Sequence, residues 1–572
     1  MALAAIIILA AGRSKRMRTQ KSKVLHALMG KPMIFYSIEL AEKLKAQKTI
    51  IVINPFGEDI KQALAQKKVE FAVQKEPLGT AHAVASALPR LKGLSGSVLI
   101  FYADNPLFSL QTLKALVQAH EDAKAALSLL TAVFPRPVPF GRIIRGARGE
   151  VLKIVEEPDC TPEQLKIREV NAGVYCVDLE FLKSALAEIK PENAQHEYYL
   201  TDIVSLASDK NLAITTGTAL DWRETIGINS RAELARAVSI LRDKINTAWM
   251  KNGVTIEIPA RVYIEPEVII GEDTVIEPDV RLSGKTKIGK NCWVQACARI
   301  IDSMIEDGVE IRQGSVLEGS QVKAGSSIGP MAHLRPGSIV GNNARIGNFV
   351  ELKNAVVGDN TIAAHLTYLG DAKIGKRVNI GAGVITCNFD GAKKSQTIIE
   401  DEAFIGSDSQ LIAPVKIGRK AYIGSGSTIT EDVPAGALAV ARAEQVIKPK
   451  WSLSKAAAGA VKKPAKKKLA AKKPKAKPKA RPIKRAEPRK AARSVKRPAP
   501  KPKKRPPAKP KARSIKRLES RAAARSVKRS AAKPKKTPTA KRKSQRPPKQ
   551  KSKSAARRLA TRAKAAQKKK KK

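Results

Sequence analysis

Cysteines and long hydrophobic runs are scarce in this chain of 572 residues. The five cysteines form no Cys-x-x-Cys pair and no even-numbered framework of the kind that stabilises small secreted domains. They indicate reduced thiols in a cytoplasmic protein. No apolar run reaches the roughly 20 residues of a membrane span, and the apolar opening MALAAIIILAAG lacks the basic segment that begins a signal peptide. These absences argue against a secreted, disulfide-stabilised or membrane-spanning protein.

Acidic and aromatic residues are nearly missing from the C-terminal segment. Residues 451–572 hold 51 of the 107 Lys and Arg but 2 of the 51 Asp and Glu, and their one aromatic residue is Trp451. A segment made mostly of Lys, Arg, Ala, Pro and Ser cannot bury a core, so it predicts a disordered basic tail over 448–572. The preceding 450 residues carry 56 basic and 49 acidic groups, so the net charge of +56 comes almost wholly from the tail.

Such a polycation is expected to bind DNA or RNA through phosphate neutralisation, without base preference. Two alternatives stay open: anchoring to an anionic membrane, and a solvated tail without a partner.

Residues 1–229 alternate short apolar runs with stretches of helical pattern, which predicts an α/β domain with a mainly parallel sheet covered by helices. The expected strands are AAIIILA, TIIVIN, SVLIFYA, ALSLLTAV and REVNAGVYCV. Residues 230–251 open with Ser230 as a helix N-cap and continue with apolar residues at helical spacing, so a single linker helix is expected there.

From residue 252 to 447 aliphatic residues recur every six positions, as in Ile264, Ile270, Ile276 and Leu282. In an α-helix a step of six rotates by about 600° and scatters these side chains over several faces. In an extended chain an even step keeps them on one face. A small or polar residue often follows the aliphatic one, as sharp corners require. The pattern predicts a parallel β-helix whose sides each send one aliphatic residue into the interior.

A strand that leads into a basic, Gly-containing loop, LAAGRSKRMRTQKSK over 9–23, suits phosphate binding, because backbone N–H groups and cations then meet an anion at the sheet edge. Alone, the pattern is weak. A second strand, SVLIFYAD, ends in Asp104 at the same edge. One carboxylate with a neutral oxygen ligand suits Mg²⁺, although a strand-end Asp is as often a turn residue.

Several spaced motifs together resemble one family. LAAGRSKRM…SK, QKEPLGTAHAV, YADNPL, FGRI, IVEEPD, VNAGVY and GIN occur in order, and the six-residue repeat follows them. Over about residues 3–447 the chain resembles the bacterial bifunctional N-acetylglucosamine-1-phosphate uridylyltransferase/glucosamine-1-phosphate N-acetyltransferase family. The resemblance implies a Rossmann-like pyrophosphorylase domain, a left-handed β-helix and a homotrimer with the acetyl-transfer site between subunits.

For the first half, the resemblance implies that Arg16 and Lys23 neutralise phosphate charge during attack on the α-phosphorus, and that Asp104 and Asn229 ligate Mg²⁺. Such in-line transfer needs charge neutralisation and alignment more than a nucleophilic side chain. The other nucleotide and sugar contacts implied are Leu9, Ala10, Ala11, Gly12, Gln74, Gly79, Thr80, Tyr102, Gly141, Glu156 and Asn171.

Three positions depart from the family pattern: Ser14 and Ala103 stand where Gly is usual, and Ser22 stands where Pro is usual. A Cβ at Ser14 narrows a loop that must approach phosphates, so a reduced rate is expected and Ser14→Gly is expected not to lower uridylyl transfer.

For the second half, the repeat loses its phase between Ile380 and Ile405, which predicts an inserted loop around NFDGAKKSQT. A lone His is usually structural, but the motif HLTYLGD around His365 resembles the family's catalytic motif and implies a base that deprotonates the sugar amine. The implied sugar-phosphate contacts are Arg335, Lys353, Tyr368, Asn379, Asn388 and Phe389, the last replacing the usual Tyr. The implied acetyl-CoA contacts are Ala382, Ser407, Ser425 and Arg442.

The leading hypothesis is an enzyme that acetylates glucosamine 1-phosphate with acetyl-CoA and couples the product, N-acetylglucosamine 1-phosphate, to UTP. It releases pyrophosphate and UDP-N-acetylglucosamine, the precursor of peptidoglycan and lipid A in this family. One alternative is a nucleotidyltransferase for another sugar with another acceptor amine. The second is a nucleic-acid-compacting protein, although the body of the chain shows no base-reading module.

Overall fold

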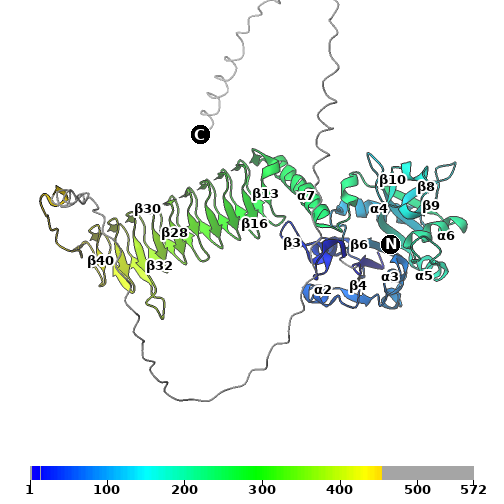
Figure 1. The fold of residues 1–572 in the computed structure, drawn as a ribbon, viewed down its shortest axis with the longest axis horizontal. Helices are drawn as coiled ribbons and strands as arrows, with labels where there is room; N and C mark the ends of the chain where they lie inside the picture. The colour runs from blue at the N-terminus through cyan, green and yellow to red at the C-terminus, as the bar shows by residue number, and fades with distance from the viewer. Residues whose placement is uncertain (1–2, 13–14, 454–572) are drawn as a thin grey trace, which may run out of the picture. The chain divides into compact units, whose positions relative to one another are not determined.

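The computed structural model describes residues 3–12 and 15–453 (Figure 1). Ser14 and nearly all of the predicted tail therefore lie outside the described residues. Within the described part of the chain, no helix is long and apolar enough to cross a membrane. All five cysteines fall inside it and are unpaired.

The N-terminal part is a mixed sheet with the central strand order β11-β7-β10-β6-β1-β4-β5. These strands are β1 (Ala5–Leu9), β4 (Lys48–Ile53), β5 (Glu70–Val73), β6 (Ser97–Tyr102), β7 (Leu127–Val133), β10 (Glu169–Asp178) and β11 (Ile214–Thr218). All neighbours pair in parallel except β10, which is antiparallel to both β6 and β7. A hairpin of β8 (Arg142–Arg145) and β9 (Val151–Val155) joins the sheet at β10, and β2 (Ala27–Leu28) pairs with β3 (Lys31–Pro32) apart from it.

Both faces of the central strands β1 and β6 are buried, which explains why these two strands are almost wholly apolar. In β1, Ala5, Ile7 and Leu9 belong to one core, whereas Ile6 and Ile8 belong to the other. The helices that cover the two faces are α1 (Met33–Leu44), α2 (Glu58–Ala63), α3 (Thr80–Ala85), α4 (Leu110–Asp122), α5 (Leu179–Glu188) and α6 (Ile203–Asp209). The predicted α/β domain is confirmed.

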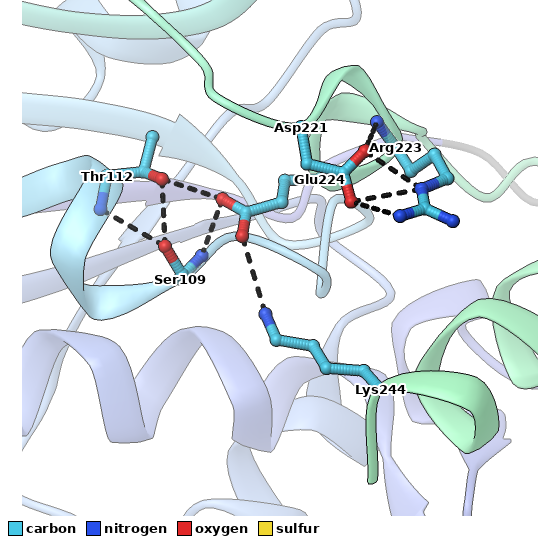
Figure 2. Close-up of polar contacts among 6 residues, drawn as sticks. All are labelled: Ser109, Thr112, Asp221, Arg223, Glu224 and Lys244. Carbon is cyan, nitrogen blue, oxygen red and sulfur yellow. Dashed lines mark hydrogen bonds and ion pairs between the residues drawn. The ribbon is translucent and has the colours of Figure 1, made fainter. Parts of the chain in front are cut away.

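The predicted linker helix is α7 (Arg231–Lys251). Ser230 accepts a hydrogen bond from the Glu233 backbone, and Glu233 accepts one from the Ser230 backbone, which is a complete capping box. Glu224 ties α7 to the rest of the domain: its carboxylate accepts bonds from the Ser109 N–H and the Thr112 hydroxyl at the start of α4, and pairs with Lys244 of α7 (Figure 2).

The repeat region forms three long parallel sheets, so each coil of the chain contributes one short strand to each sheet. The first sheet is β12 (Thr255–Ile256), β15 (Val275–Ile276), β18 (Trp293–Val294), β21 (Glu310–Ile311), β24 (Ser327–Ile328), β27 (Arg345–Asn348), β30 (Ile362–His365), β33 (Asn379–Ile380), β36 (Phe404–Ile405), β39 (Tyr422–Ile423) and β41 (Leu438–Ala439). The second is β13 (Tyr263–Ile264), β16 (Arg281–Ser283), β19 (Arg299–Ile301), β22 (Val316–Glu318), β25 (His333–Leu334), β28 (Glu351–Lys353), β31 (Tyr368–Gly370), β34 (Ile385–Cys387), β37 (Gln410–Ile412) and β40 (Thr428–Ile429). The third is β14 (Ile269–Ile270), β17 (Lys287–Ile288), β20 (Met304–Ile305), β23 (Gln321–Val322), β26 (Ile339–Val340), β29 (Val356–Val357), β32 (Ala372–Ile374), β35 (Thr397–Ile399) and β38 (Val415–Ile417).

The six-residue step maps onto these sheets in turn. Ile264, Ile270 and Ile276 lie in the second, third and first sheet respectively, and each is buried in one common core. Stacking on the next coil repeats the pattern, with Ile264 opposite Leu282 and Ile276 opposite Val294. The predicted β-helix of hexapeptide repeats is confirmed.

Candidate active sites

A cavity of about 480 Å³ opens where β1 and β6 end, next to each other in register at Leu9 and Tyr102. Ten of the residues implied by the family resemblance line it: Leu9, Ala10, Ala11, Gly12, Lys23, Gln74, Gly79, Thr80, Tyr102 and Asp104. They come from four separate stretches of sequence, which the parallel topology brings to one edge of the sheet.

Lys23, Asp104 and Asn229 meet in this region. The Lys23 ammonium pairs with the Asp104 carboxylate and donates to the Asn229 Oδ1 at 2.7 Å. The Lys23 and Asp104 side chains are 12% and 15% exposed. The Ile228 N–H donates to the Asp104 carbonyl at 2.8 Å, so the backbone itself holds the Asn229 segment against the end of β6.

These residues fit a magnesium ion by the chemistry of their donors. One carboxylate and one amide oxygen both point at a single cationic atom, Lys23 Nζ, so two hard oxygen ligands converge on one point. Mg²⁺ is commonly held by one or two protein oxygens and completes its shell with water and substrate phosphate. The described residues contain no cluster of three or more His, Cys, Asp or Glu side chains suited to a metal.

The loop before α3 is shaped by a glycine. Gly79 has φ +120°, and a Cβ there would lie 2.5 Å from the Tyr198 carbonyl oxygen, so another residue cannot be accommodated. The buried Gln74 side chain donates to the Gly79 carbonyl at 2.9 Å, and the Thr80 hydroxyl accepts a bond from the Leu200 N–H. Gln74, Gly79 and Thr80 therefore form one rigid wall of the cavity.

Tyr102 connects this wall to the implied sugar contacts. Burial raises the pKa of Tyr102, and the negative charges of the Glu156 and Asp104 carboxylates raise it further. Burial also raises the pKa of Glu156. A Cβ on Gly141 would lie 3.2 Å from the Glu156 carboxylate, and the Asn171 N–H donates to the Gly141 carbonyl at 2.9 Å.

Three other residues considered for the first site are Arg16, Ala103 and Ser14, of which the described two, Arg16 and Ala103, do not line the cavity. Arg16 lies in the short 3-10 helix Lys15–Met17 and is exposed. Ala103 is fully buried and donates its N–H to the Leu9 carbonyl at 3.0 Å. Ser14 lies outside the described residues, so the expectation for Ser14→Gly stays a prediction.

In the β-helix, cations gather beside the inserted loop, whose residues 388–396 separate β34 from β35. The neighbouring Lys394 ammonium lowers the pKa of Lys353, and Arg335 adds to the effect. Arg335 also pairs with the Glu351 carboxylate at 3.0 Å. The remaining positive charge of Lys353 and Lys394 suits an anion. Lys394 was not anticipated from the sequence, because only the folded loop places it beside Lys353.

The loop is tied to the β-helix by Asp371. Asn388 of the loop and Asn354 of a neighbouring coil both donate to its carboxylate. Burial raises the pKa of Asp371, but these two bonds and the Lys394 and Lys353 charges outweigh burial, so the pKa falls below its usual value. Phe389, which is 59% exposed, forms a backbone bridge with Lys394.

His365 is exposed at the end of β30, with Asn348 next to it on the preceding coil. The His365 Nδ1 lies 2.7 Å from the Asn348 Oδ1, an oxygen that can only accept. In the neutral ring, a proton on Nδ1 would donate to this oxygen and leave Nε2 as the basic nitrogen. Tyr368 and Asn379, both half-buried, lie on β31 and β33, and the Tyr368 hydroxyl leans over Gly370.

The four implied acetyl-CoA contacts form a column along one corner of the β-helix. Ala382, Ser407 and Ser425 each follow the glycine after an inward aliphatic residue of β33, β36 and β39. The Ala382 carbonyl accepts from Asp408, and the Ser407 carbonyl accepts from Gly426. Arg442 donates to the Ser425 carbonyl at 2.8 Å.

Asn348→Ala is expected to lower kcat of acetyl transfer about tenfold, because one neutral hydrogen bond of up to about 1.5 kcal/mol no longer fixes the His365 ring. KM for acetyl-CoA should change little. The matched control is Asn342→Ala, which removes another amide hydrogen bond between neighbouring coils, the one that Asn342 donates to Asp359 at 3.0 Å. Initial rates of thiol release measure both variants, and an equal fall in both would assign Asn348 to fold stability alone.

Comparison with known proteins identifies the class of both halves. Residues 6–157 match the model for a MobA-like NTP transferase domain, residues 258–365 match a GMPPB C-terminal domain, and residues 396–431 match six bacterial transferase hexapeptide repeats. The fold and sites thus define a two-domain transferase, with a nucleotidyltransferase half and a hexapeptide half.

The chain is 45% identical over 456 residues to the bifunctional protein GlmU of Trichlorobacter lovleyi, covering 80% of this chain and 99% of the relative. It is 47% identical over 452 residues to that of Geotalea uraniireducens, covering 79% and 99%. It is also 47% identical over 440 residues to that of Thermodesulfovibrio yellowstonii, covering 77% and 97%. The chain belongs to the GlmU family of bifunctional proteins.

Proposed function

We propose that this chain catalyses two consecutive steps of UDP-N-acetylglucosamine synthesis. The β-helix transfers acetyl from acetyl-CoA to glucosamine 1-phosphate, and the N-terminal domain then transfers uridylyl from UTP to the product, releasing pyrophosphate. The observation that carries the proposal is that one chain holds both constellations: Lys23 in contact with Asp104 and Asn229, and His365 in contact with Asn348.

For uridylyl transfer, the sugar phosphate oxygen attacks the α-phosphorus of UTP and the bond to pyrophosphate breaks. Lys23 neutralises negative charge on the phosphates, and the Gln74–Thr80 wall orients the uridine. Glu156 and Asn171 hold the sugar beside Tyr102. Asp104 and Asn229 would hold a Mg²⁺ ion, which would supply charge neutralisation and phosphate alignment.

For acetyl transfer, the amine of glucosamine 1-phosphate attacks the thioester carbonyl of acetyl-CoA and coenzyme A leaves as the thiol. The ammonium form of the amine has no lone pair and cannot attack. His365 Nε2 takes the proton that the amine must lose. Arg335, Lys353 and Lys394 bind the phosphate, and the corner column ending at Arg442 binds coenzyme A.

The test is an assay of the purified chain with glucosamine 1-phosphate, acetyl-CoA, UTP and Mg²⁺, following free thiol and pyrophosphate separately. Thiol should appear first and pyrophosphate after it, and chelation of Mg²⁺ should stop pyrophosphate alone. The same assay with other sugar 1-phosphates tests the alternative of a different sugar. A faster rate with any of them would replace the proposed substrate.

We propose that the active form is a homotrimer of β-helices. Met331, Phe349 and Leu366 form an apolar ladder along one corner, 47%, 58% and 62% exposed, and all three have positive φ. Large exposed apolar side chains in a strained backbone are unfavourable in an isolated chain. Leu366 follows His365 directly, so a partner covering this ladder also encloses the base.

The basic tail is proposed to bind nucleic acid without sequence preference, on its charge alone. A chain ending at Lys450 should keep both activities, since every candidate site residue lies at or before Arg442, but should lose nearly all affinity for DNA and RNA. Binding of unrelated sequences from roughly 50 to 200 mM salt measures this, because multi-phosphate binders lose orders of magnitude over that range. Affinity that is sequence-selective, salt-insensitive or unchanged by truncation would contradict the proposal.

A further inference from the structure

The residue before Lys23 is held in an unusual way. Ser22 lies between a loop and the 3-10 helix Lys23–Leu25, with φ −53° and ψ 131°. Its N–H donates to Asp59 Oδ2 at 2.9 Å, and its hydroxyl donates to Asp59 Oδ1 at 2.7 Å. The two oxygens of the Asp59 carboxylate thus accept the two hydrogen bonds that Ser22 can donate. The Ser22 hydroxyl does not cap the 3-10 helix that follows.

Asp59 belongs to a part of the chain distant from Ser22, and it is held in place by a helix that packs on the core. It lies in the first turn of α2 (Glu58–Ala63), 37 residues after Ser22, beside the fully buried Ile60. On the other side of Lys23, Val24 and Leu25 are buried. Lys23 is therefore fixed downstream by the core and upstream by the carboxylate of Asp59.

Backbone position matters for a lysine because its four-carbon stem has many rotamers. The Lys23 ammonium must reach Asp104, Asn229 and the substrate phosphates from one Cα position. Hydrogen bonds to a charged acceptor are the stronger kind, so a two-bond clamp on the adjacent residue restricts that Cα effectively.

We propose that Asp59 is a positioning residue for uridylyl transfer: by clamping Ser22 it places the Lys23 ammonium at the phosphates. The inference rests on the proposed function of Lys23. The clamp also explains how Ser22 adopts a φ that is typical of proline. The Asp59 carboxylate restrains the backbone of Ser22 through hydrogen bonds, as a pyrrolidine ring would restrain it covalently.

The first experiment is a double-mutant cycle. Asp59→Ala should lower kcat of uridylyl transfer about tenfold, which is the loss expected of one charge-assisted contact, with acetyl transfer unchanged in the same sample. In a Lys23→Ala background, Asp59→Ala should have no further effect, because the lysine through which it acts is gone. Additive losses would overturn the proposal and assign Asp59 to general stability. Full activity of Asp59→Ala would also overturn it.

The matched control is Glu58→Ala, which changes the neighbouring acid of the same turn, where Glu58 pairs with Lys61 at 2.9 Å. It should retain uridylyl transfer. A loss equal to that of Asp59→Ala would show that any damage to α2 suffices.

The second experiment replaces the clamp covalently. Ser22→Pro should keep activity within about threefold of the parent, since the observed φ lies within the range of proline. Ser22→Pro with Asp59→Ala should match Ser22→Pro alone. A tenfold further loss in the double variant would show that Asp59 acts elsewhere. If Lys23→Ala itself left uridylyl transfer intact, the proposed function of the site would fail, which is a separate outcome.

Discussion

Replacing His365 by alanine is expected to lower acetyl transfer about 10²- to 10⁴-fold, the range that a positioned general base contributes. Uridylyl transfer to supplied N-acetylglucosamine 1-phosphate should stay within about twofold of the parent rate, because substitutions at distant, independent sites do not affect one another. The reason is that His365 lies on β30 of the β-helix, whereas Lys23, Asp104 and Asn229 belong to the N-terminal part.

The measurement is thiol release from acetyl-CoA and pyrophosphate release from UTP on one preparation. Uridylyl transfer then serves as the internal control for folding. A His365→Ala protein that retains acetyl transfer would remove His365 from the mechanism. A folded variant that loses both activities would contradict the separation of the sites.

Replacing Asp104 by alanine is expected to have the reverse effect, lowering uridylyl transfer about 10²- to 10³-fold, as loss of a preorganised electrostatic group does. Asp104 serves twice in the proposed site: it pairs with Lys23 and supplies the charged oxygen for Mg²⁺. Asp104→Asn keeps the shape and one oxygen but loses the charge, so it should need more Mg²⁺ for half-maximal rate than the parent.

Pyrophosphate release across a Mg²⁺ titration measures both variants, with thiol release as the folding control. Asp122→Asn is the matched surface control, since Asp122 is exposed at the end of α4 and bonded to Gln118. An Asp104→Asn protein with an unchanged Mg²⁺ requirement would exclude Asp104 as a ligand.

The features that could be predicted from sequence are those set by local chemistry. The six-residue step has one physical solution in extended chain, and the capping box at Ser230 begins α7 where expected. The sequence predicted a strand at β10 but not that it runs antiparallel to β6 and β7. The direction of a strand depends on the path of the connection that precedes it, which the strand's own residues do not encode.

The site residues that escaped prediction act on partners distant in sequence. Asn348 reaches His365 across one coil of 17 residues, and Asp59 reaches Ser22 across 37. Neither carries a motif, and only coil stacking and the placement of α2 bring them to their partners. The resemblance supplied the roles of Lys23 and Asp104. The strand-end pattern alone left Asp104 undecided between a metal ligand and a turn residue.

The most direct test of two separate sites on one chain is a mixing experiment. His365→Ala and Asp104→Ala proteins are each given glucosamine 1-phosphate, acetyl-CoA, UTP and Mg²⁺, alone and then in equal mixture. Alone, neither should form UDP-N-acetylglucosamine at an appreciable rate. Mixed, they should form it after a lag, because one variant supplies N-acetylglucosamine 1-phosphate that the other consumes. A mixture as inactive as its components, with both proteins folded, would contradict the account.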